Sequence, residues 1–114
     1  MIAPSQVNPT NFPVQHILYE EGDDGFAIAW GAFDRGPERL GMRWSGEAGN
    51  PDDIGYPKVF GNPMWFVLPE ALSVPILKAL VGIPSGKQAP VLQVLEVLRT
   101  RGALEAASPA VPSA

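Results

Sequence analysis

Cysteine is absent from the sequence, and histidine occurs once, as His16. Without thiols there is no disulfide and no thiolate metal site, and one imidazole builds neither a Cys–His pair nor a histidine-rich metal cage. The phosphate-binding glycine loop and the Gly-x-Ser-x-Gly turn are also missing. These absences favour a protein that is not an enzyme, although they leave that question open, and we expect no cofactor and no bound metal.

Basic side chains are scarce: eight Lys and Arg face twelve Asp and Glu, a net charge of −4. Binding to nucleic acid or to anionic membranes needs basic clusters, so we expect neither. No apolar run approaches the length of a membrane span, and the first residues lack the basic and apolar regions of a signal peptide. The sequence therefore predicts a soluble, cytoplasmic protein.

A length of 114 residues fits one domain. Residues 1–13 hold three prolines and two asparagines without periodicity, which indicates a flexible N-terminal segment. Residues 105–114 are small and proline-rich, which is typical of a disordered tail. We therefore expect a single α+β domain over residues 14–104.

The clearest pattern covers residues 26–44, where large side chains alternate with small ones on both sides of the turn-forming residues 34–38. An apolar strand precedes this pattern, and Gly22-Asp23 favours a hairpin between them. The apolar run Trp65–Leu68 fits a short fourth strand that is buried on both faces. The sequence thus predicts an antiparallel meander of three or four strands, over about 15–21, 25–33 and 38–45, with 65–68 as the optional fourth.

The alternation predicts which residues share each face of this sheet. We expect Tyr19 opposite Phe26, and Trp30 opposite Met42, because these registers gather the large side chains together. What we call the heavy face then holds Ile17, Tyr19, Phe26, Ile28, Trp30, Leu40, Met42 and Trp44. The opposite, light face holds His16, Leu18, Glu20, Ala27, Ala29, Gly31, Phe33, Arg39, Gly41, Arg43 and Ser45.

Two helices are expected in the C-terminal part, over about 73–81 and 90–101. Gly82 and Gly102 are placed to end them, and Pro90 suits the first turn of the second. Their apolar stripes are broad enough to cover the heavy face. The expected architecture is therefore α+β, with both helices packed on one face of the meander.

The light face suggests a ligand-binding site. The predicted registers set His16, Ala29 and Arg43 in one row across three strands, with two donor side chains flanking a methyl group. Such a notch could hold a carboxylate or phosphate. An acid of the chain itself could fill it instead, and the N-terminal segment or residues 46–63 could cover the whole face.

The long irregular stretch 46–63 suggests a surface for a partner, since loops of this length are often functional. Its polar groups are Asn50, Asp52, Asp53 and Lys58, and Tyr56 is its aromatic anchor if the ring points outward. The alternative is a surface meander pinned by its aromatic residues.

The favoured function is a small non-enzymatic protein-interaction domain, an accessory, inhibitor or immunity-type partner of another protein. The alternative is a small-ligand or anion-binding module that uses the light face. We expect a monomer or a weak homodimer. The sequence does not identify the partner, the ligand or the biological process.

Overall fold

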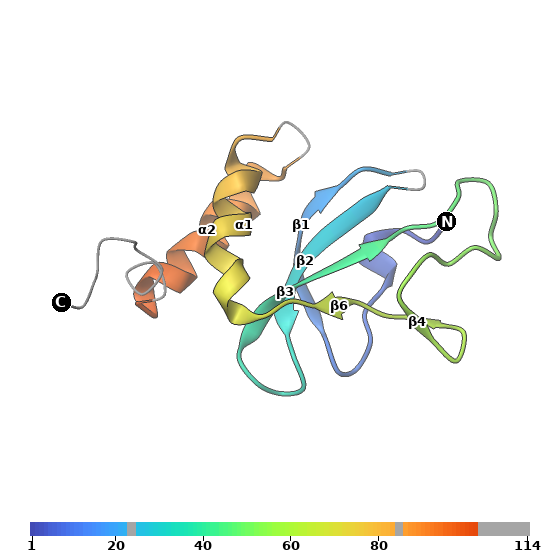
Figure 1. Ribbon diagram of the computed structural model, residues 1–114, viewed down its shortest axis with the longest axis horizontal. Coiled ribbons are helices and arrows are strands. Elements are labelled where there is room, and N and C mark those ends of the chain that lie inside the picture. The colour runs from blue at the N-terminus through green and yellow to red at the C-terminus, as the bar shows by residue number, and fades with distance from the viewer. Residues whose placement is uncertain (23–24, 84–85, 103–114) are drawn as a thin grey trace.

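The computed structural model describes residues 1–22, 25–83 and 86–102. The elements are η1 Pro4–Gln6, β1 Val14–Glu20, β2 Phe26–Ala32, β3 Glu38–Trp44, β4 Lys58–Val59, β5 Asn62–Pro63, β6 Phe66–Val67, η2 Glu70–Leu72, α1 Ser73–Val81 and α2 Gln88–Thr100. The α+β prediction is confirmed: an antiparallel sheet in the order β1-β2-β3-β6 is followed by two helices. Figure 1 shows the helices together at one end of the sheet, and the β4–β5 hairpin at the other.

The optional fourth strand exists as β6. It pairs antiparallel with β3, with Gly41 opposite Val67 and Met42 opposite Phe66. The expectation that this strand is buried on both faces is wrong, because Phe66 is 58% exposed. The strand therefore presents a large aromatic side chain to solvent beside β3.

The pairing of β2 with β3 differs from the prediction by two residues. Trp30 lies opposite Leu40, not Met42, and Phe26 lies opposite Trp44. The strands close through a tight turn in which Asp34 and Arg35 have φ of 51° and 63°. A shift of two keeps every side chain on its predicted face, so alternation alone could not distinguish the two registers.

The pairing of β1 with β2 is interrupted by two irregularities, one between Val14 and His16 and one between Ile17 and Tyr19. Each inserts a residue and changes which face the following side chains occupy. Tyr19 consequently lies opposite Ile28, not Phe26. Ile17 leaves the heavy face, while Leu18 joins Tyr19 on it.

The main core lies between the heavy face and the two helices, as predicted. Helix α1 has the predicted bounds, and α2 begins two residues earlier than expected. The buried residues of this core are Leu18, Tyr19, Ile28, Trp30, Leu40, Leu68, Val74, Leu77, Leu80, Val91, Val94 and Leu98. Burial of this apolar surface holds the helices on the sheet.

The N-terminal segment covers the light face and forms a second core. Val7 and Phe12 are each 1% exposed, and the indole of Trp65 donates a 2.7 Å hydrogen bond to the Val7 carbonyl. A Cβ added at Gly41 would lie 3.0 Å from the Phe12 ring, so this ring packs where the sheet has no side chain. Residues of the N-terminal segment thus pack on the sheet, while the domain bounds of 14–104 stay a prediction.

The predicted tail, residues 105–114, lies outside the described residues. Within the described part of the chain, no helix is long and apolar enough to cross a membrane.

Candidate functional site

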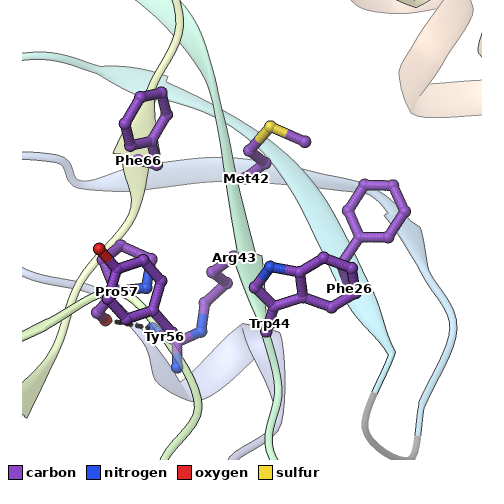
Figure 2. A pocket seen from close by; sticks show the side chains of 7 residues that line it. All are labelled: Phe26, Met42, Arg43, Trp44, Tyr56, Pro57 and Phe66. Carbon is purple, nitrogen blue, oxygen red and sulfur yellow. Dashed lines mark hydrogen bonds between the residues drawn. The ribbon is translucent and has the colours of Figure 1, made fainter.

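The helices leave one end of the heavy face open, and an apolar hollow of about 200 Å³ lies there. We call this hollow the aromatic groove. Figure 2 shows Trp44 and Tyr56 on opposite sides of it and Phe66 at a third side. These rings are 53%, 63% and 58% exposed. The lining residues are Phe26, Met42, Arg43, Trp44, Tyr56, Pro57 and Phe66.

The sheet positions one wall of the groove. Phe26 at the start of β2 pairs with Trp44 at the end of β3, and their ring centroids are 5.3 Å apart. Phe26 also contacts Tyr19 at 5.3 Å, which connects this wall to the main core. The offset, tilted packing of these rings is a favourable aromatic geometry. The exposed indole of Trp44 is therefore supported by Phe26, which is partly buried against the main core.

The opposite wall comes from the long loop. The Trp44 amide donates a 2.7 Å hydrogen bond to the Tyr56 carbonyl, and the Tyr56 amide returns a 3.1 Å bond to the Trp44 carbonyl. This reciprocal pair fixes the backbone of Tyr56 beside the end of β3 and leaves its ring outside. The Tyr56–Pro57 peptide bond is cis, and Gly55 has φ of 76°.

Arg43 fastens this loop from behind the groove. It is only 2% exposed, and its guanidinium donates hydrogen bonds to the carbonyls of Ile54, Pro57 and Met64. Burial lowers the pKa of Arg43. No carboxylate among the described residues forms an ion pair with it, so its charge is met by carbonyl dipoles alone.

The predicted ligand row of His16, Ala29 and Arg43 does not form. His16 pairs with Trp30, Ala29 with Gly41, and Arg43 with Ala27. Because directly paired residues share a face, His16 and Arg43 lie on opposite sides of the sheet. Ala29 is fully buried beneath the N-terminal segment. The error came from the irregularities in β1 and the two-residue shift of β3.

Three of the five predicted partner residues lie together. Asp53, Tyr56 and Lys58, with Trp44, line a shallow hollow of about 370 Å³ on the other side of Tyr56. Asn50 and Asp52 do not line it and belong to an exposed turn, where the Asp52 amide donates a 3.0 Å bond to the Asn50 side chain. Their role in binding a partner stays a prediction.

The Asp53 carboxylate organises this turn. It accepts hydrogen bonds of 2.9 Å from the Glu47 amide and 3.1 Å from the Gly55 amide. These two bonds lower the pKa of Asp53 by stabilising its charged form. The side chain is thus engaged within the loop, whereas Tyr56 and Lys58 are exposed beside it.

Sequence reasoning missed three exposed aromatic residues of this region. Trp44 was assigned to the covered heavy face and Phe66 to a buried strand. Phe60 occupies the tip of the β4–β5 hairpin, is 98% exposed and has φ of 50°. The one available signal was Phe60-Gly61 followed by Asn62, a glycine-containing turn between short strand-forming segments.

Comparison with protein-family models, curated proteins and solved structures finds no match to this chain. Among residues 1–22, 25–83 and 86–102, no group of three or more His, Cys, Asp or Glu side chains could hold a metal ion. The seven residues that line the aromatic groove include no Asp, Glu, His, Cys, Ser or Lys. What its geometry offers is contact area and hydrogen-bond donors.

Proposed function

We propose that the protein is a small interaction domain that binds another protein through the aromatic groove and the adjoining β4–β5 hairpin. The observation that carries the proposal is the convergence of Trp44, Tyr56 and Phe66, each more than half exposed, around one hollow. Large aromatic side chains are enriched at protein interfaces and supply most of the binding energy there.

The support of these rings also fits an interface. Trp44 packs against the Phe26 ring. The backbone of Tyr56 is held by its reciprocal hydrogen bonds with Trp44, and the surrounding loop is held by the hydrogen bonds of Arg43. Rings that are fixed before binding lose little conformational freedom when a partner covers them. Contiguous apolar surface of this kind on a folded domain marks interaction sites.

The alternative function, a ligand site on the light face, finds no comparable support. Val7, Phe12 and Trp65 pack against Ala27 and Ala29, which are both fully buried. The interaction proposal therefore relies on the aromatic groove and the adjoining β4–β5 hairpin, not on the light face.

Affinity capture from an extract of the source cells tests the proposal. The bait is the full chain, either wild type or Trp44→Ser, and the matched control is Leu92→Ser. Leu92 is 53% exposed, like Trp44, but it lies on α2 away from the groove. We expect a protein that the wild type and the Leu92→Ser variant retain and the Trp44→Ser variant loses.

Thermal melts of all three baits verify that they are folded before capture. If the retained proteins are the same for Trp44→Ser and Leu92→Ser, the groove is not the contact surface. The double variant Tyr56→Ser/Phe66→Ser then provides an independent comparison, because it alters the two other walls and leaves the Phe26–Trp44 contact intact.

A further inference from the structure

Two hydrogen-bond donors at the groove have no partner among the described residues: the indole Nε1 of Trp44 and the hydroxyl of Tyr56. The interior counterparts are different. Trp65 donates from its indole to the Val7 carbonyl, and the Tyr19 hydroxyl donates to Glu21 at 2.6 Å. The groove thus offers polar donors on the edges of otherwise apolar walls.

Three backbone carbonyls beside the groove already accept hydrogen bonds, which leaves the Tyr56 hydroxyl oxygen as the side-chain acceptor. The carbonyls of Trp44 and Tyr56 accept from each other's amides, and the Pro57 carbonyl accepts from the Met64 amide at 2.9 Å and from Arg43. A ligand with many amide N–H groups would leave them unpaired here, which costs free energy. A ligand rich in carbonyls and poor in N–H groups suits the groove, and proline supplies carbonyls without N–H.

The charge distribution around the groove further restricts the class of ligand that it can bind. The lining contains no carboxylate, and its single charged residue is Arg43, whose buried guanidinium lies behind the aromatic walls. Aromatic walls alone would also suit a quaternary ammonium group. The positive charge of Arg43 opposes such a cation, whereas an uncharged apolar segment meets no repulsion and its carbonyl dipoles are attracted.

We propose that the aromatic groove binds an uncharged proline-rich segment of a partner protein in the extended polyproline II conformation. A proline ring would sit between Trp44 and Tyr56, and flanking carbonyls would accept hydrogen bonds from the indole and the phenol. Recognition of preformed polyproline helices by aromatic grooves is a general binding mode with a low ordering cost. This inference rests on the proposed interaction function and specifies its ligand.

The test is a titration of the full chain, labelled with nitrogen-15, with a synthetic proline decamer, followed by nuclear magnetic resonance. The indole N–H signals of Trp30, Trp44 and Trp65 report on three separate places in the fold. We expect a saturable shift of the Trp44 signal and no comparable shift of the Trp65 signal, which is already hydrogen-bonded in the interior.

Two variants keep an aromatic ring at each position and remove the donor, although Trp44→Phe also replaces the indole with a smaller ring. Trp44→Phe lacks the indole N–H, and Tyr56→Phe lacks the hydroxyl. Each should weaken binding of the decamer about fivefold, the value of one ordinary hydrogen bond. For Trp44→Phe the shifts of the Gly55 and Tyr56 amides replace the lost indole signal. Unchanged affinity in both variants overturns the assigned donors and with them the proposal.

Other ligands define the outcomes that contradict the inference. A decamer of alternating glycine and serine that shifts Trp44 equally well, or tetramethylammonium chloride that shifts it more strongly, overturns recognition of proline. The absence of a saturable Trp44 shift at millimolar decamer also overturns recognition of proline. If capture still distinguishes Trp44→Ser from Leu92→Ser, the interaction function stands and only the ligand class fails.

The chain's own Pro109-Ala110-Val111-Pro112 is a competing occupant by its sequence. The full-length double variant Pro109→Ala/Pro112→Ala tests this. If the variant binds the proline decamer several-fold more tightly than the wild type, the groove serves the chain's own segment and the partner proposal is overturned. Equal affinity in the two proteins supports an external ligand.

Discussion

Arg43 in β3 and Met64 in the segment before β6 are joined by a 2.6 Å hydrogen bond from the guanidinium to the main-chain carbonyl. The same guanidinium donates hydrogen bonds to the carbonyls of Ile54 and Pro57, so one buried side chain binds the long loop at three residues. The position of the Tyr56 wall of the groove therefore depends on a buried side chain of β3 that lies behind it.

Replacing Arg43 with methionine should destabilise the domain by about 3 kcal/mol. The change removes the donors and leaves up to three buried carbonyls unpaired, at about 1–3 kcal/mol for each group that water cannot reach. Urea denaturation measures the effect. Arg39→Met is the control, because Arg39 lies on the same face of β3 but is only partly buried. Equal losses in the two variants would show that the Arg43 bonds are unimportant.

Gly41→Ala should destabilise the domain by about 1–3 kcal/mol, because the new methyl would lie 3.0 Å from the Phe12 ring and 3.1 Å from Trp65 Cβ. Phe12→Leu makes room at the same place. A double-mutant cycle in chemical denaturation should therefore give a favourable coupling between the two changes. Strictly additive losses would mean that the N-terminal segment does not pack on the sheet at Gly41.

Phe60→Asn should stabilise the domain by about 1 kcal/mol. Phe60 has φ of 50° and Gly61 has φ of 77°, the left-handed pair of a type I′ turn, in which asparagine is favoured at the first position. Phe60→Ala is the control, since alanine carries the same backbone strain and should bring no comparable gain. Thermal or urea unfolding gives the comparison, and equal stability of the two variants contradicts the strain.

Stability should fall in acid partly through Glu21. Hydrogen bonds from the Tyr19 hydroxyl and the Phe26 amide lower the pKa of Glu21 in the folded state. The stabilisation is therefore present above the unfolded pKa and is lost as pH falls through the folded one. Glu21→Gln removes this titration, so the difference in unfolding free energy between wild type and variant should shrink as pH falls. A difference in unfolding free energy that stays constant with pH contradicts this role of Glu21.

The same bond acts in the opposite direction on Tyr19, whose pKa it raises. This contribution is present below the unfolded pKa of tyrosine and is lost as pH rises through the folded one. Tyr19→Phe should raise the pKa of Glu21, which nuclear magnetic resonance titration of the carboxyl carbon measures. An unchanged Glu21 pKa would mean that the hydrogen bond does not form in solution.

Periodicity predicted the parts of the fold that depend on which face a residue occupies. Ile28, Trp30 and Leu40 alternate with small residues, so the sheet and its helical cover followed from the pattern. The pairing of individual residues across the strands could not be predicted from this alternation. The turn through Asp34 and Arg35 selects a register two residues from the predicted one, and alternation is identical in both.

The candidate site was harder to predict, for a physical reason. Apolar alternation assigned Trp44 and Arg43 to faces but carried no information on how far the helices extend. Whether Trp44 is covered depends on where α1 and α2 lie along the sheet, which is a property of the whole packing arrangement. The predicted role of Tyr56 as an outward aromatic side chain agrees with its exposure, while its function in binding stays a prediction.

The two faces of the sheet are covered by segments from opposite ends of the chain, and this fixes an order of events on the ribosome. Phe12 and Val7 are synthesised before the strands they cover, and the light face closes once Trp65 has also emerged. The heavy face must wait for α1 and α2, and a nascent chain that pauses before Ser73 holds Trp30 and Leu40 open to solvent. That interval is the period in which a growing chain is most prone to aggregate or to recruit a chaperone.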